Sequence, residues 1–250
     1  MSTPAREVVV TPPHDAAEPH PGFVRRYVFS TDHKIIGIQY TLTGLVMAIV
    51  GALLAVLIRL QLGWPAHQWQ WLALLLPKGM PSGVMTPEFY LAVVTMHGTI
   101  MVFFFISYVL VSGLGNFLVP LQVGARDMAF PFLNMLSFWI GLLSALVMVV
   151  SFFVEGGAAA AGWTAYPPLS AVWSAVPGSQ LGQTIWLLSM ALFITSFTMS
   201  SLNIVATVFS LRAPGMSMWR MSLTVWSYFI SAILGLLAFP ALFVSAVMMS

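Results

Sequence analysis

Five long stretches of almost uncharged, apolar residues constrain the fold of this chain more than any other feature of its sequence. A helix that crosses a bilayer needs ~20 predominantly apolar residues, and each stretch is long enough. Only 6% of the 250 residues are charged and 59% are hydrophobic, whereas a soluble domain carries roughly a quarter charged residues. The sequence therefore predicts an all-α integral membrane helix bundle with five transmembrane helices. The expected spans cover about residues 35–60, 88–122, 130–154, 181–211 and 221–248.

The placement of charged residues predicts the orientation of the bundle. Residues 1–25 are polar and rich in proline, so we expect a disordered cytoplasmic tail ahead of a transmembrane domain over residues 26–250. No short apolar segment precedes a small-residue cleavage site, and we expect no cleaved signal peptide. With the N-terminus inside, only Arg59 and Lys78 of the nine Lys and Arg residues lie outside. The positive-inside rule then favours a multi-pass protein of the cell's inner (plasma) membrane with a cytoplasmic N-terminus.

The composition leaves histidine and carboxylate side chains as the candidate metal ligands, because cysteine is absent. A formal net charge of +2 gives no reason to expect a nucleic-acid partner. Among five histidines only His97 falls inside a predicted span, and an ionisable group there suggests a function. His97 could be an axial haem ligand, with Gly98 leaving room for a flat macrocycle. Alternatively, it could be a neutral imidazole that is hydrogen-bonded to a neighbouring helix.

Arg59 is the second candidate, at the outer end of the first span. By helix length we expect it at about the same depth as His97. Its planar guanidinium group suits carbonyl and carboxylate acceptors, so it could bind a haem substituent. The alternative is an interfacial arginine whose side chain extends to the lipid headgroups.

Asp127 is the third candidate, in the inner loop between the second and third spans. It could simply pair with the adjacent Arg126 at a helix end. However, polar residues from four predicted spans fall mostly in the same inner half of the membrane, where unsatisfied amides are costly. They favour a hydrated, proton-conducting entrance, although interhelical hydrogen bonding would also explain them. These residues are Tyr40, Asn116, Asn134, Ser137, Ser196 and Asn203.

Several motifs occur in an order that resembles a known family. They include Ser30-Thr-Asp-His-Lys34, Leu57-Ile-Arg59 and the stretch from Gly115-Asn116 through Val119-Pro120 to Asp127-Met-Ala-Phe-Pro131, and Gly162-Trp-Thr164 follows. Over about residues 25–240 the chain resembles subunit I of haem–copper oxidases, in the cytochrome c oxidase branch. Such a subunit has about twelve helices, of which these would be helices I–V.

The resemblance implies a role for each candidate. His97 matches an axial ligand of the low-spin haem iron, and Arg59 matches an arginine that binds the formyl group of that haem, which suggests haem A. Asp127 matches the entrance of the D proton pathway, and Trp163 matches a tryptophan near the propionates of the second haem. Residues matching positions along the pathway are Tyr40, Asn116, Asn134, Ser137 and Asn203. The second haem and copper are expected from later helices that this sequence does not contain.

The resemblance also implies partners and leaves alternatives open. We expect a proton-pumping terminal oxidase that reduces O₂ to water with electrons from cytochrome c, together with a subunit II that carries a two-copper site and a subunit III. A quinol oxidase would use the same residues with another donor. A non-redox membrane scaffold or transporter would use the polar residues to bind an ion. The outer loop between the first two spans looks longer than is usual in the family.

Overall fold

The computed structural model describes residues 22–154, 156–172 and 180–249, in two separate units. Most of the tail predicted over residues 1–25 therefore lies outside the described residues. In the first unit, which extends to Ser30, a short π-helical turn η1 spans Val24–Val28. Within it Arg26 lies over the Tyr27 ring at 5.2 Å from the ring centre. The second unit, Thr31–Ser250, contains the bundle and is described by itself below.

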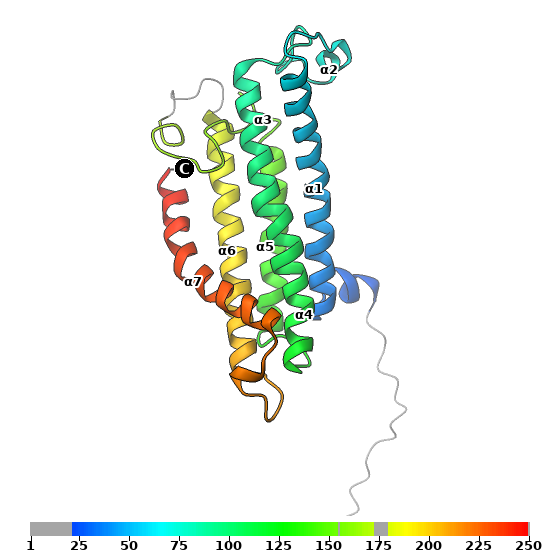
Figure 1. Cartoon of the computed structure of the whole chain (residues 1–250), viewed down its shortest axis with the longest axis vertical. Helices are drawn as coiled ribbons and strands as arrows, with labels where there is room; N and C mark the ends of the chain where they lie inside the picture. Colours follow the sequence, from blue (N-terminus) through cyan, green and yellow to red (C-terminus); the bar gives the residue numbers. More distant parts are fainter. Residues whose placement is uncertain (1–21, 155, 173–179, 250) are drawn as a thin grey trace, which may run out of the picture. The chain divides into compact units, whose positions relative to one another are not determined.

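Five helices of the second unit are long and apolar enough to cross a membrane, and the described residues form no strand (Figure 1). The predicted all-α, five-span fold is confirmed. The second span, Pro87–Val123, is continuous but not a uniform α-helix, because its central segment has π-type winding. The helices are α1 (His33–Gly63), α2 (Gln70–Leu75), α3 (Pro87–Thr99), η2 (Ile100–Gly113), α4 (Leu114–Val123), α5 (Pro131–Val150), α6 (Gln180–Ser210), η3 (Met218–Arg220) and α7 (Leu223–Met249).

Local sequence explains where the spans begin. Asp32 caps α1, because its carboxylate accepts the backbone N–H of Lys34 at 2.7 Å. Thr86 caps α3 in the same way through the N–H of Phe89 at 3.3 Å, and proline occupies the first position of that helix. Each cap satisfies donors that would otherwise lack partners at a membrane-facing helix end.

Glycines at seven-residue spacing bring α1 against the second span. A Cβ atom on Gly37 would lie 2.8 Å from the carbonyl oxygen of Gly113, and one on Gly44 would lie 2.8 Å from the Val109 side chain. A Cβ on Gly51 would meet Met101 at 2.6 Å. Since real side-chain atoms cannot approach so closely, these glycines allow the two backbones to pack tightly. This contact aligns α1 with the helix that carries His97.

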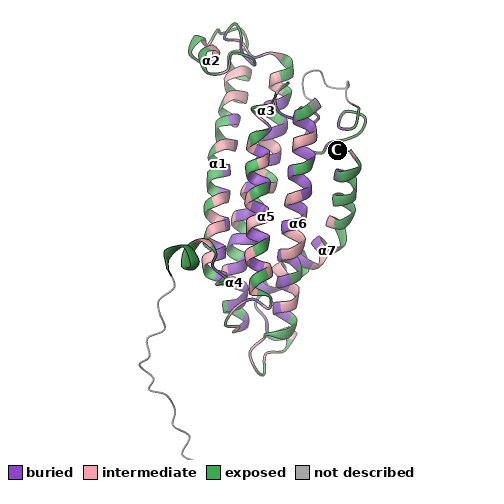
Figure 2. Cartoon of the chain, turned by 180° about the vertical axis from the view of Figure 1, so that it is seen from behind, coloured by how far each residue is buried: buried purple, intermediate pink, exposed green. Residues whose placement is uncertain are grey.

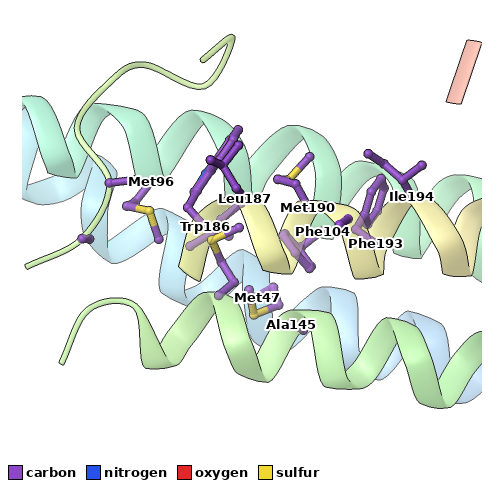
Figure 3. Packing of buried hydrophobic residues seen from close by; sticks show 14 of the residues in the cluster. Met47, Met96, Phe104, Ala145, Trp186, Leu187, Met190, Phe193 and Ile194 are labelled. Atoms are coloured by element: carbon purple, nitrogen blue, oxygen red, sulfur yellow. The ribbon is translucent and has the colours of Figure 1, made fainter. Parts of the chain in front are cut away.

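The interior of the bundle is built mainly around α6, which packs against both α5 and α7. It is the most buried of the five spans, whereas α7 is the least buried (Figure 2). Figure 3 shows Trp186, Met190 and Phe193 of α6 meeting Met96 and Phe104 of the second span in this core. α7 contains Pro240 and bends along its length (Figure 1), as proline inside a helix usually causes. The core therefore lies beside the His97-bearing segment.

Candidate functional site

His97 is held by α1 through one of its two ring nitrogens. Its Nδ1 lies 2.9 Å from the carbonyl oxygen of Gly51. A carbonyl oxygen only accepts hydrogen bonds, so Nδ1 donates this bond and Nε2 is the ring nitrogen left to bind another group. Among the described residues Nε2 has no hydrogen-bond partner, and the side chain is half-buried. Metal-binding histidines are commonly oriented in this way, with the other nitrogen donating to a backbone carbonyl.

The space beside Gly98 is already filled, which corrects the expectation that this glycine leaves room for a macrocycle. A Cβ atom on Gly98 would lie 3.1 Å from the indole ring of Trp163. The missing side chain therefore accommodates Trp163, which packs directly against the helix one residue after His97. About 45% of the Trp163 side chain remains exposed, so its outer face is available to another group.

Two threonines that the sequence analysis missed hold this region together. Thr95 Oγ1 accepts the backbone N–H of Gly162 at 2.9 Å, which fixes the turn that carries Trp163. Gly162 has φ of 84°, a left-handed conformation that glycine adopts readily. Thr99 Oγ1 accepts the indole N–H of Trp186 at 3.0 Å and donates to the Thr95 carbonyl at 2.9 Å. Their four-residue spacing in an apolar run was a signal that could have revealed them.

Arg59 and His97 are not brought into one layer, contrary to the sequence-based expectation. His97 is level with Gly51, and Arg59 lies eight residues further along α1, which corresponds to ~12 Å of helix rise. The Arg59 side chain is exposed. A group bound by both residues would therefore have to span that separation.

In the half of the bundle where α1 begins, three hydroxyl groups from three helices meet. Tyr40 of α1 donates its O–H to Ser137 Oγ of α5 at 3.0 Å and lies 3.2 Å from Ser196 Oγ of α6. Ser196 also donates to the Ser137 carbonyl at 2.6 Å. All three side chains are buried. The predicted polar cluster thus exists, and at this level its hydroxyl groups bond to one another.

Two buried asparagines in the same half lack partners for part of their amide groups. Asn134 is fully buried, and neither its Oδ1 nor its Nδ2 has a hydrogen-bond partner. Asn116 is also fully buried; its Nδ2 donates to the Ser112 carbonyl at 2.8 Å, but its Oδ1 has no partner. Buried polar atoms without a protein partner usually bind ordered water, since leaving them dry costs ~1–3 kcal/mol each. These three atoms favour a hydrated interior.

Asp127 lies in the loop beneath these asparagines. Its carboxylate accepts the backbone N–H of Met128 at 2.7 Å, and no ion pair joins it to Arg126 in the described part of the chain. Burial raises the pKa of the Asp127 carboxyl above its ordinary value, with the nearby Asp32 adding to the rise. The Met128 N–H and His33 act in the opposite direction. Nδ1 of His33 lies 2.8 Å from the Asn116 carbonyl oxygen, so one histidine links Asp127 to the Asn116 backbone.

Asn203 has a different arrangement from the other asparagines. Its Oδ1 accepts the N–H of Phe130 at 2.9 Å, and its Nδ2 donates to the Phe130 carbonyl at 3.2 Å. Thr207 accepts the N–H of Ala129 at 2.9 Å. Through these hydrogen bonds, Asn203 and Thr207 of α6 stabilise the loop that contains Asp127. Asn203 was predicted from the sequence, whereas Thr207 was not.

The geometry defines a class of protein: a multi-pass membrane protein with one half-buried histidine, whose ring is oriented by a backbone carbonyl, and a separate buried polar cluster. Comparison with known proteins then gives the family. Residues 35–250 match the profile of the cytochrome c and quinol oxidase polypeptide I family, and the chain belongs to that family. Haem and copper are the cofactors of this family.

Curated relatives are similar over most of this chain. It is 47% identical over 224 residues to the alternative cytochrome c oxidase subunit 1 of Bradyrhizobium diazoefficiens, covering 90% of this chain and 35% of the relative. It is 40% identical over 228 residues to the heme-copper oxidase subunit I+III of Aeropyrum pernix, covering 91% and 26%. It is 36% identical over 216 residues to cytochrome c oxidase subunit 1 of Thermostichus vulcanus, covering 86% and 35%. The chain thus spans between 26% and 35% of the length of these relatives.

Proposed function

We propose that this chain is the N-terminal part of the catalytic subunit of a proton-pumping terminal respiratory oxidase, which reduces O₂ to water. In this proposal, the chain supplies one axial ligand of the low-spin haem and the entrance of the D proton pathway. The oxygen-reducing haem and copper would be held by residues beyond the 250 of this sequence. Membership of the oxidase family and the similarity to curated oxidase subunits support this function.

The single observation that carries the proposal is the hydrogen bond between His97 Nδ1 and the Gly51 carbonyl. It supports the proposal because a ring held through Nδ1 would leave Nε2 to ligate iron. When bound, the haem supplies reversible one-electron transfer, and its potential depends on its axial ligands and on nearby hydrogen bonds. Arg59 would donate to the formyl group of haem A at the outer edge of the macrocycle. Trp163, with its exposed face, would lie near the propionates of the second haem.

The inner polar residues would conduct protons. Asp127 would collect protons from the cytoplasm, since a carboxyl group with a raised pKa exchanges protons closer to neutral pH. Water bound to the unpartnered amide atoms of Asn116 and Asn134 would continue the path. The hydroxyl groups of Tyr40 and Ser137 would then carry the proton path further into the bundle. In this proposal, Asn203 holds the Asp127 loop in place through Phe130.

Replacement of His97 tests the proposal most directly. In the intact oxidase, His97→Ala should abolish the low-spin haem absorption band, because the iron loses an axial ligand. His67→Ala is the matched control, since His67 is exposed and lies in the loop between α1 and α3. It should leave the band unchanged. If the purified wild-type protein has no haem absorption band, the alternative function as a non-redox membrane scaffold or transporter would be supported instead.

The electron donor, the partners and the orientation form the finer part of the proposal. We propose cytochrome c as the donor, with subunits II and III as partners, in the inner (plasma) membrane with the N-terminus in the cytoplasm. The matching family includes quinol oxidases as well, so a quinol is the alternative donor. A two-copper site in the purified complex would favour cytochrome c. Labelling of Lys78→Cys by an impermeant reagent applied outside intact cells would test the orientation.

A further inference from the structure

The segment between α1 and α3 is a folded cap with its own small core. Leu72 of α2 is buried together with Met80 and Met85. The backbone N–H of Trp69 donates to the Gly83 carbonyl at 2.8 Å, and the N–H of Thr86 donates to the Gly79 carbonyl at 3.0 Å. These contacts fix α2 relative to the ends of α1 and α3. The exposed surface of α2 is therefore held in one orientation relative to the cap.

That surface is apolar. Trp71, Leu74 and Leu75 lie at positions i, i+3 and i+4 of α2, which places them on one face of the helix. All three are exposed, Leu74 by 84%, while Leu72 points into the core of the cap. We call these three residues the α2 face. In Figures 1 and 2 the helix lies at the end of the bundle on the side of α1.

Three features of the surroundings indicate what covers the α2 face. Between Leu60 and Pro87 the only charged side chain is that of Lys78, which is exposed, and no acid is present. Exposed apolar side chains also lie at the end of α1 that leads into the cap, where Leu62 is exposed by 66% and Trp64 by 58%. Tryptophan is enriched where a protein meets the bilayer interface, and an apolar face beside a cation suits phospholipid headgroups.

We propose that the α2 face lies in the boundary between headgroups and acyl chains of the leaflet next to it, with Lys78 on the lipid phosphates. The bilayer would then hold the cap from the side, while the hydrogen bonds of the cap hold the ends of α1 and α3. These are the two helices that carry Gly51 and His97. The proposal concerns lipid binding by the cap and does not depend on a haem at His97.

The absence of cysteine from the chain makes a direct test possible. Leu74→Cys would be spin-labelled in the complete oxidase complex, reconstituted into vesicles of phosphatidylcholine with phosphatidylglycerol. Collisions with O₂, which concentrates in the bilayer, would be compared with collisions with a water-soluble nickel chelate. The matched control is Ser82→Cys, which is exposed in the same cap but lies outside α2. Signal from cysteines of other subunits is subtracted with the unmodified complex.

The proposal expects the Leu74 label to shift toward O₂ collisions relative to the Ser82 label. In Lys78→Gln this shift should weaken in vesicles with phosphatidylglycerol, because an attraction to anionic phosphates is lost. Equal access of nickel to both labels would overturn the proposal, since the face would then be in water. A Leu74 label that is immobile and shielded from both collision partners would also overturn it, because a protein subunit would then cover the face.

Discussion

The region around His97 and the region around Asp127 treat buried polar groups in opposite ways. Near His97, the Nδ1 atom, both threonines and the Trp186 indole all find partners within the chain. Among the described residues, Nε2 of His97 is left without a partner. Near Asp127, three amide atoms of Asn116 and Asn134 are buried without any protein partner.

This difference indicates what each region requires from outside the chain. In the His97 region the buried threonines and the Trp186 indole are paired within the chain, and the histidine keeps one ring nitrogen free, as metal-binding histidines commonly do. In the Asp127 region three buried amide atoms lack a hydrogen-bond partner from the protein. This arrangement is expected where water molecules supply the missing hydrogen bonds.

The largest effect is expected from Asp127→Asn. If this carboxyl group collects protons, its loss should slow proton uptake by roughly 10²-fold, the lower range for loss of a proton-transferring group. The haem spectrum should stay intact, because the His97 region shares no hydrogen bond with this loop. Uptake would be followed with a pH-sensitive dye during turnover of the complete oxidase.

Arg126→Gln provides the control for that experiment. Arg126 is the neighbouring exposed residue and forms no ion pair with Asp127 in the described structure. Its replacement should leave proton uptake nearly unchanged. Normal uptake and pumping in Asp127→Asn would show that the entrance is elsewhere.

Asn134→Leu tests the hydrated interior with a smaller effect. If Asn134 were dry, removing its unpaired amide would stabilise the protein by ~1–3 kcal/mol. If it binds water, the leucine should displace that water, slow proton uptake and give no such gain. Thermal unfolding and dye-monitored uptake measure the two outcomes. Leu136→Ala is a suitable control, because Leu136 is exposed two residues further along α5. A more stable protein with normal uptake would contradict the hydrated path.

Thr95→Val tests the completeness of the His97 region. The Gly162 N–H would lose its acceptor at a cost of ~1–3 kcal/mol, and the turn that carries Trp163 should loosen. Hydrogen exchange of the peptide containing Gly162 should accelerate, and the low-spin haem potential should shift while its band remains. Thr95→Ser keeps the hydroxyl group and should restore slow exchange. Unchanged exchange in the valine variant would show that the turn is held by other contacts.

Much of the fold could be predicted, because a bilayer imposes long apolar runs that are visible in the sequence. His97 and Asn134 were visible for the same reason, as polar residues inside such runs. The partners of these residues were not visible. The acceptor of His97 is a backbone carbonyl 46 residues away, and any residue type has such a carbonyl.

The errors have the same origin. The depth of Arg59 was misjudged because helix length alone does not give the register between α1 and α3. The empty space expected beside Gly98 is filled by Trp163 from a distant loop. The helix α2 was not expected, because six residues are too few to show a helical period. Long-range contacts of this kind leave little trace in local sequence patterns.

The smallest effect expected is the pH dependence of Asp127 itself. Because burial raises the pKa of its carboxyl in the folded protein, the proton binds more tightly there than in the unfolded chain. The group therefore contributes stability that is present below the unfolded pKa and is lost as the pH rises through the folded pKa. Wild type and Asp127→Asn should accordingly diverge in thermal stability over that window, with the asparagine variant relatively more stable at the higher pH. Infrared spectra should show a protonated carboxyl band that persists above the ordinary pKa of aspartate and is absent from the variant. A band that disappears at or below that ordinary pKa would mean that the Met128 N–H and His33 outweigh burial, and Asp127 would then be poorly suited to release protons toward the asparagines.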